Sequence, residues 1–215
     1  IRALTLAARV TGDRYFGLKH GTRGRFTANP LGYLMANSPD LRTGLRNFAR
    51  FQPVLATNHL AFVETAGAGR IEFSYPVTIP NAVQMTDFVL MRFVSRIRAA
   101  VGSHWRPVSV GLMHRQPADI SEYERHLGSR ILFDQQVNSI TISAATLALP
   151  MPDADPQDLL LLDDLLGIAD EDRPPLVIDP DARRRRVTAM VNAATLARTD
   201  PALVKFQFDV GNAAQ

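Results

Sequence analysis

The sequence predicts an α+β domain in which an antiparallel or mixed sheet of hairpins packs against one long helix, after a small helical region. Segments 59–65 and 70–77 alternate apolar with polar residues, and the glycine-containing segment 66–69 between them is typical of a β-hairpin turn. Segment 81–101 then carries an apolar stripe with helical spacing and ends at Gly102. Strands joined directly by hairpins pair antiparallel, which favours this fold class.

Several helices are expected before the hairpin. Three short segments have apolar residues at helical spacing and predict brief helices: 1–9, 15–21 and 31–36. A longer amphipathic helix follows, for which Ser38 is the expected cap, Pro39 suits the first turn and Pro53 marks the end. These helices form the small helical region of the predicted fold.

After the long helix we expect a strand, a short helix and two further strands. Alternation over 108–112 indicates a strand whose apolar face includes Val108. A polar segment interrupts the pattern, and a short helix then ends at Gly128. Alternation resumes over 131–149, which predicts the last two strands.

The composition changes after Leu149. Prolines and aspartates dominate 150–156, and an acidic, leucine-rich segment follows. We expect one domain over 1–150, then an acidic linker helix and a C-terminal helical appendage over 151–215. The four arginines of 183–186 favour a solvated helix start, because they lack the interleaved aromatic residues of a single-strand nucleic-acid clamp.

The composition also excludes several classes of protein. The 215 residues include no cysteine, which rules out disulfides and thiolate metal sites. No apolar run approaches the roughly eighteen residues of a membrane-spanning helix, and the sequence does not open on a signal segment. A net charge of +3 is too small to indicate nucleic-acid binding. We therefore expect a cytoplasmic protein that does not interact with a membrane.

Neither catalysis nor metal binding is expected. The five histidines show no helical spacing of four that would place two ligands on one face: His20, His59, His104, His114 and His126. No GxSxG motif is present, and acid pairs such as Glu122 and Glu124 are typical of a solvated helix face. The sequence thus predicts no enzyme, no metal and no cofactor.

A small-molecule pocket is expected between the long helix and the sheet. Its predicted apolar walls are Phe48, Phe73, Tyr75, Phe88, Met91, Trp105 and Met113. Its predicted polar groups are Tyr33, Arg92 and His114, and the arginine favours a carboxylate. For each aromatic residue taken singly, a plain core position is the alternative, and Arg92 has the alternative of reaching out to solvent.

Several segments, in order, resemble the N-terminal effector-sensing, arabinose-binding-like domain of AraC-type bacterial transcription regulators. They are TGDRYFGLKHG (11–21), LGYLMANSPDLRTGLRNFARFQPVL (31–55), the hairpin before Pro76 and HLGSRILF (126–133). The resemblance covers roughly residues 1 to 157. It implies that 1–150 senses a small-molecule effector and forms a homodimer. The residues of the predicted pocket favour an effector that is apolar or carboxylate-bearing. The predicted elements do not resemble the all-β cupin barrel of the arabinose regulator itself.

In such regulators DNA is contacted by a helix-turn-helix pair, which this sequence lacks, so DNA binding is expected only through a domain outside it. Residues 165–204 resemble a segment of regulators that join a nucleotide cyclase to a STAND-type ATPase, but no GxxxxGK[ST] loop accompanies them. That second resemblance leaves one alternative open, a protein–protein interaction module of a larger signalling protein.

Overall fold

The protein forms an open, mixed five-stranded sheet with helices around it, so the predicted α+β fold class is confirmed and the sheet is not a closed barrel. The computed structural model describes residues 2–22, 30–54, 58–65, 67–75, 82–152, 154, 160–161 and 178–198. Its strands are β1 (His59–Thr65), β2 (Ala68–Ser74), β3 (Ser109–Gly111), β4 (Arg130–Leu132) and β5 (Asn138–Ser143). Its helices are α1 (Arg2–Thr11), α2 (Phe16–His20), α3 (Pro30–Ala36), α4 (Leu41–Phe51), α5 (Val83–Val101), α6 (Ser121–Leu127), α7 (Ala144–Leu147) and α9 (Pro180–Arg198), with a 3-10 turn at Gln52–Val54.

The strand order is β1-β2-β5-β3-β4. The pairs β1–β2, β2–β5 and β5–β3 are antiparallel, and β3–β4 is parallel. The hairpin predicted around residue 67 is therefore confirmed. The last two predicted strands do not pair with each other, because β5 lies between β2 and β3 in the middle of the sheet.

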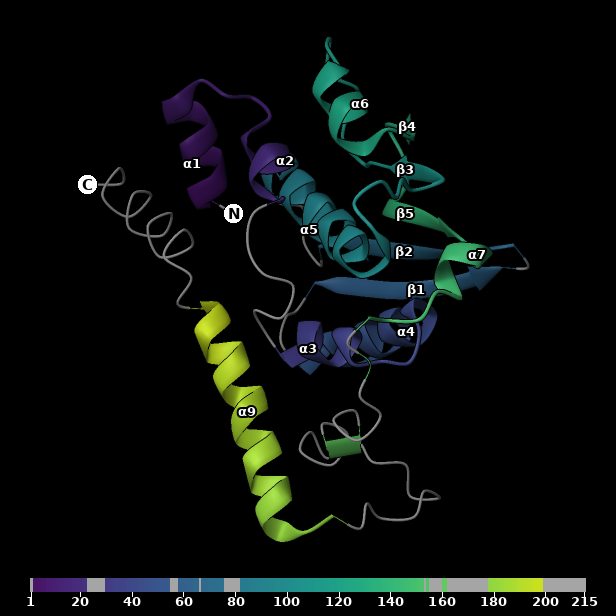
Figure 1. Ribbon diagram of the computed structural model, residues 1–215. Coiled ribbons are helices and arrows are strands. Elements are labelled where there is room, and N and C mark those ends of the chain that lie inside the picture. The colour runs from purple at the N-terminus through teal and green to yellow at the C-terminus, as the bar shows by residue number, and fades with distance from the viewer. Residues whose placement is uncertain are drawn as a thin grey trace.

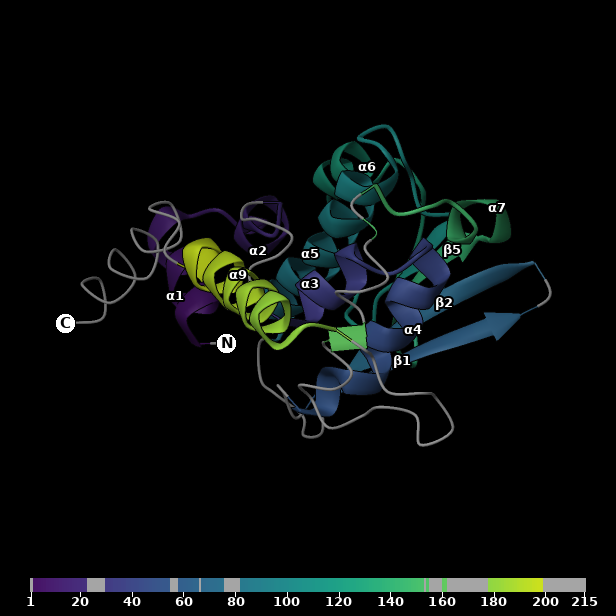
Figure 2. The ribbon, with the colours of Figure 1, turned by 60° about the horizontal axis from the view of Figure 1, so that its bottom comes forward.

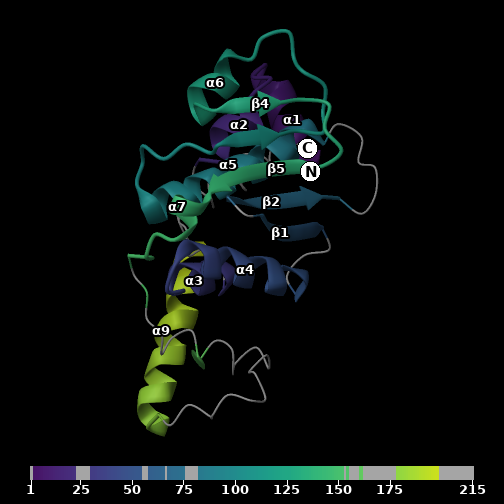
Figure 3. The ribbon, with the colours of Figure 1, turned by 90° about the vertical axis from the view of Figure 1, so that its right-hand side faces the viewer.

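The long helix α5 lies across one face of the sheet, and other helices enclose it (Figures 1 and 3). Helices α1 and α2 cover its outer side, while α3 and α4 lie near β1 and α6 lies near β4. Helix α9 extends away from the sheet beside α3, which it contacts (Figure 2). Helix α5 is thus the central helix of the domain.

The apolar stripe predicted for the long helix is largely confirmed. Leu90, Met91, Val94 and Ile97 have no exposed surface. Val83 is the exception, since it is 37% exposed at the first position of the helix. Gly102 ends the helix, as predicted, with a φ of 116° that L side chains rarely adopt.

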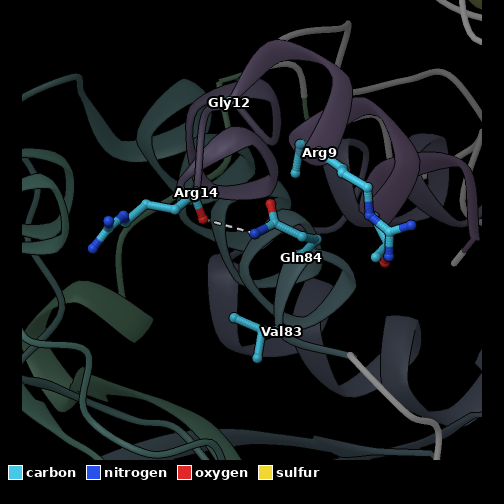
Figure 4. A pocket seen from close by; sticks show the side chains of 7 residues that line it. Arg9, Gly12, Arg14, Val83 and Gln84 are labelled. Carbon is cyan, nitrogen blue, oxygen red and sulfur yellow. Dashed lines mark hydrogen bonds between the residues drawn. The ribbon is translucent and has the colours of Figure 1, made fainter.

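Helix α2 docks on α5 through two glycines one turn apart. A Cβ atom at Gly17 would lie 2.0 Å from the backbone oxygen of Gln84, and one at Gly21 would lie 2.6 Å from Cβ of Met91. The Gln84 side chain stabilises the same contact with two hydrogen bonds. Its Oε1 accepts from Gly17 N at 2.8 Å. Its Nε2 donates to the Arg14 carbonyl at 2.7 Å (Figure 4). Only glycine lets the two backbones approach so closely.

The cap of α4 differs from the prediction. The Asp40 carboxylate accepts from Thr43 N at 2.7 Å and is the N-cap. Ser38 is instead fully buried, and its hydroxyl donates to the Leu34 carbonyl at the end of α3. Serine and aspartate are both favourable N-cap residues, and Ser38 and Asp40 lie only two positions apart. The path of the chain between α3 and α4 determines that Asp40 is the cap.

The strand expected to run to Leu149 ends earlier. Ser143 closes β5 and caps α7, where its Oγ accepts from Thr146 N at 3.2 Å. Two other expectations are corrected at β3, where Val108 is 55% exposed and Met113, a predicted pocket wall, is 46% exposed. The strand is only three residues long, and both side chains lie beyond its ends.

We expect Gly17→Ala to lower the free energy of unfolding by about 1–3 kcal/mol, the usual effect of overpacking a tight contact. Urea unfolding of the purified chain measures this change. Gly67→Ala is the matched control, because a Cβ there meets nothing within 4 Å. Equal unfolding midpoints for the two variants would contradict the close approach of α2 to α5.

Candidate ligand-binding site

The residues predicted to line one pocket lie at several places along α5. His114 lies beside Asp87 near the start of the helix. Tyr75 also lies close enough to the Asp87 carboxylate to interact with it electrostatically. Phe48 packs against the middle of the helix, through the ring of Phe93. Of the other predicted residues, Trp105 follows the helix C-terminus, Tyr33 is on α3, and Phe88 and Arg92 are on α5. Phe73 on β2 and Met91 on α5 are fully buried core residues. Their role as ligand contacts stays a prediction.

Two buried charged residues divide these positions into two clusters. Asp87 is completely buried and Arg96 is 9% exposed, and both belong to α5. Nine residues separate them, which places them about half a turn apart around the helix and roughly 13 Å apart along it. They therefore lie on opposite sides of α5 and cannot neutralise each other.

Hydrogen bonds satisfy the carboxylate of Asp87. Tyr123 on α6 donates its hydroxyl to Oδ2 at 2.7 Å, and Nε2 of His114 lies 3.2 Å from Oδ1. Tyr15 on α2 packs edge-on against Tyr123, and Phe133 packs against both Tyr123 and His114. The cluster thus joins α5 to α2, α6 and the ends of β3 and β4.

The protonation states in this cluster follow from its partners. Burial lowers the pKa of His114, but the hydrogen bond to Asp87 and the charge of that carboxylate raise it by more, so the net pKa is raised. Both ring nitrogens face oxygen acceptors, since Nδ1 lies 3.0 Å from the Arg115 carbonyl, and the doubly protonated ring satisfies both. Burial and the negative charge of Asp87 raise the pKa of Tyr123, which stays a donor.

The guanidinium of Arg96 lies on the other side of α5, against two aromatic rings. Its Cζ is 5.1 Å from the centroid of the Phe48 ring and 5.8 Å from that of Phe93. The two rings contact each other edge to face at 5.4 Å. The buried Nε has no hydrogen-bond partner, and within the described residues no carboxylate pairs with this guanidinium.

Arg92 lies one turn before Arg96 on the same side of α5. Burial lowers the pKa of Arg92, and burial together with the positive charge of Arg92 lowers the pKa of Arg96 to about 9. Arg96 nevertheless stays charged at neutral pH. The sequence prediction named Arg92 and missed Arg96, although Phe93 and Ile97 on either side of Arg96 in the apolar stripe signalled its burial.

Arg98 shows how this fold otherwise accommodates an arginine. Its Nε donates to the Trp105 carbonyl at 3.0 Å, and its Nη2 donates to the His126 carbonyl at 2.9 Å, at the C-terminal end of α6. A cation at a helix C-terminus is favourable, because the last carbonyls carry partial negative charge. Among the described residues, Arg96 has no comparable acceptor.

A separate hollow of about 450 Å³ opens where α1 and α2 meet the start of α5 (Figure 4). It is lined by Thr5, Ala8, Arg9, Gly12, Arg14, Val83 and Gln84. None of the predicted pocket residues lines it. Arg9, Gly12 and Arg14 are exposed to solvent, so this is a surface hollow and not an enclosed cavity.

The fold is shared with a bacterial transcription regulator. The crystal structure of the transcriptional regulator CdpR from Pseudomonas aeruginosa matches with a TM-score of 0.59 and 13% identity, covering 94% of this chain and 83% of that chain. The chain belongs to the family described as the N-terminal arabinose-binding domain of AraC transcription regulators, which matches residues 1–151. The family predicted from the sequence is therefore confirmed. No curated protein matches the chain.

Two further observations bear on the expected location and chemistry. Among the described helices, none has the length and apolarity needed to cross a bilayer. The described residues also contain no group of three or more histidine, aspartate or glutamate side chains that could hold a metal ion. Residues 165–177 and 199–204 of the segment that resembled cyclase and ATPase regulators lie outside the described residues, and the AraC family match ends before that segment.

Tyr123→Phe is expected to lower the free energy of unfolding by about 1.5–3 kcal/mol, because it removes a donor from a buried carboxylate. Tyr15→Phe is the matched control. Its hydroxyl donates to the uncharged Asp119 carbonyl at 2.6 Å, and we expect a smaller loss of about 0.5–1.5 kcal/mol. Chemical denaturation of both variants makes the comparison, and a larger loss for Tyr15→Phe would contradict the assigned roles.

The raised pKa of His114 predicts a pH-dependent contribution to stability. The stabilisation from protonated His114 is fully present below the pKa that this histidine has in the unfolded chain, 6.5. It is lost as the pH rises through the higher pKa of His114 in the folded protein. The stability advantage of the wild type over His114→Gln should therefore be largest in mild acid and shrink on the alkaline side. Urea titrations at several pH values measure it, with His104→Gln at an exposed loop position as control. An advantage that grows with pH would contradict the His114–Asp87 pairing.

Proposed function

We propose that this chain is the effector-sensing and dimerising domain of an AraC-type transcription regulator and controls an attached helix-turn-helix DNA-binding domain. The observation that carries the proposal is the family match over residues 1–151, since this family is the N-terminal domain of AraC regulators. The proposed effector is a small molecule, apolar or carboxylate-bearing. We further propose a cytoplasmic homodimer that contacts DNA only through the attached domain.

The enclosure of α5 supports a sensing role. Its two buried charged residues face different neighbours, with Asp87 toward α6 and Arg96 toward α4. A ligand that binds one arrangement of these elements better than another shifts the population toward that arrangement. The shift reaches the attached DNA-binding domain only if that domain or the dimer also distinguishes the two arrangements.

The full-length regulator should bind its own promoter with an affinity that depends on one metabolite. A coupling of 1–3 kcal/mol, typical of allosteric proteins, corresponds to a change of about 5- to 150-fold. Gel-shift titration of promoter DNA against a metabolite collection measures this change. Identical affinity in the presence of every metabolite would contradict the sensing role.

Sedimentation equilibrium tests dimerisation. At micromolar concentration it should give twice the mass of one full-length chain. A strictly monomeric protein that still responds to an effector would remove dimerisation from the proposal and leave sensing in place.

A further inference from the structure

Arg96 carries a charge that the described residues do not compensate. Transferring a cation out of water costs several kcal/mol even after the protein relaxes around it. Buried charges are therefore normally paired and hydrogen-bonded. Arg96 is 9% exposed, its Nε is unpartnered, and no ion pair within the described residues includes it.

The two aromatic rings offset only part of this cost. A desolvated cation–π contact is attractive but supplies no hydrogen-bond acceptor, and Phe48 and Phe93 both make one with Arg96. The nearby charge of Arg92 acts in the opposite direction, since it disfavours a second cation on the same side of α5. The exposed Arg50 has the same geometry over Phe51, at 5.1 Å, but stays hydrated.

The ring contacts do not supply a hydrogen-bond acceptor for the guanidinium, whose Nε has no partner. Rings attract the guanidinium through its face, whereas its N–H groups lie in its plane. A planar fork of N–H donors matches a carboxylate with two parallel hydrogen bonds. A planar anion such as a carboxylate therefore fits the N–H edge of the Arg96 guanidinium. The rings of Phe48 and Phe93 favour an apolar group attached to that anion.

We propose that Arg96, with Arg92 one turn away and the rings of Phe48 and Phe93 as walls, binds the carboxylate of a small organic acid with an apolar body. The site lies between α4 and α5. The proposal deepens the proposed function and rests on it, because it names the chemical class of the effector and the residue that selects it. An organic phosphate shares the anionic chemistry, and the experiment separates the two.

Binding at this place would join two parts of the domain. Phe48 belongs to α4, and α4 is tied to β1 through Arg42 and Arg46, which both pair with Glu64. Arg96 belongs to α5, which packs on the sheet. A ligand between the two helices would therefore stabilise one relative position of α4 and α5.

The test measures thermal unfolding and calorimetric binding of the chain with matched acids and amides. The probe pairs are phenylacetate with phenylacetamide and hexanoate with hexanamide, extended to a panel of aromatic and aliphatic monocarboxylates, with phenyl phosphate and inorganic phosphate alongside. A ligand that binds only the folded state raises the unfolding temperature as its concentration rises. We expect at least one carboxylate to do so, its amide not to do so, and the phosphates to act more weakly.

Arg96→Met tests the residue itself, and Arg50→Met is its matched control. Methionine keeps much of the volume but removes the charge and all the N–H donors. We expect Arg96→Met to lose about 10- to 100-fold in carboxylate affinity, the usual effect of losing charge-assisted hydrogen bonds. Without ligand, its unfolding temperature should be unchanged or higher, because an unpaired buried charge is gone. Arg50→Met should bind like the wild type.

A purely structural role predicts a different pattern. Arg96→Met would then unfold at a lower temperature, and its response to acids would equal that of the wild type. If Arg96→Met does not fold, Arg96→Lys replaces it, since lysine keeps the charge but lacks the fork and should still weaken carboxylate binding.

Three outcomes overturn the proposal: no acid of the panel stabilises the wild type, acid and amide act equally, or the Arg96 variants bind as well as the wild type. The proposed function survives any of these if promoter binding by the full-length regulator still responds to a metabolite. The proposed function fails, and the Arg96 site stands, if an acid binds at Arg96 but no metabolite changes the affinity of the full-length regulator for its promoter.

Discussion

The enclosure of α5 is the constraint on which the rest of the structure depends. The helix lies on the sheet and carries α2 on its outer side. Its side chains also contact Phe48 of α4 and Tyr123 of α6. A helix enclosed in this way must either be apolar all round or supply a partner for each polar group that it buries. Helix α5 buries Asp87 and Arg96 on opposite sides, and the environment of each decides what that side can do.

The two sides meet this constraint differently. On the α6 side, Tyr123 and His114 satisfy Asp87 from separate elements, so the cluster holds the domain together without any ligand. On the α4 side, two aromatic rings surround Arg96, but no acceptor does so within the described residues. A complete hydrogen-bond network belongs to the scaffold, whereas an incomplete one is suited to a ligand. This contrast is the reason for proposing a ligand site between α4 and α5.

The fold was largely predictable from local patterns, and the candidate site only in part. The hairpin, the long helix and its end at Gly102 follow from periods of two and of 3.6 residues and from a positive φ. The role of His114 as a ligand contact stays a prediction, and its partner Asp87, 27 positions earlier in the sequence, was not predicted. The sequence pointed to Arg92 and not to Arg96, which lies one turn later on the same side of the helix, and only the packing around them shows that Arg96 is the more buried.

The sequence by itself determined the family, the fold class and the apolar face of α5, because these depend on residue order and short-range periodicity. The tertiary structure decided the rest: that Gly17 and Gly21 are contact residues, that β5 lies in the middle of the sheet, and that Asp87 is satisfied while Arg96 is not. The physical reason is that burial and pairing are properties of neighbours brought together from distant parts of the chain. The free-energy cost of burying a charged side chain depends on the groups packed around it, and these are known only from the tertiary structure.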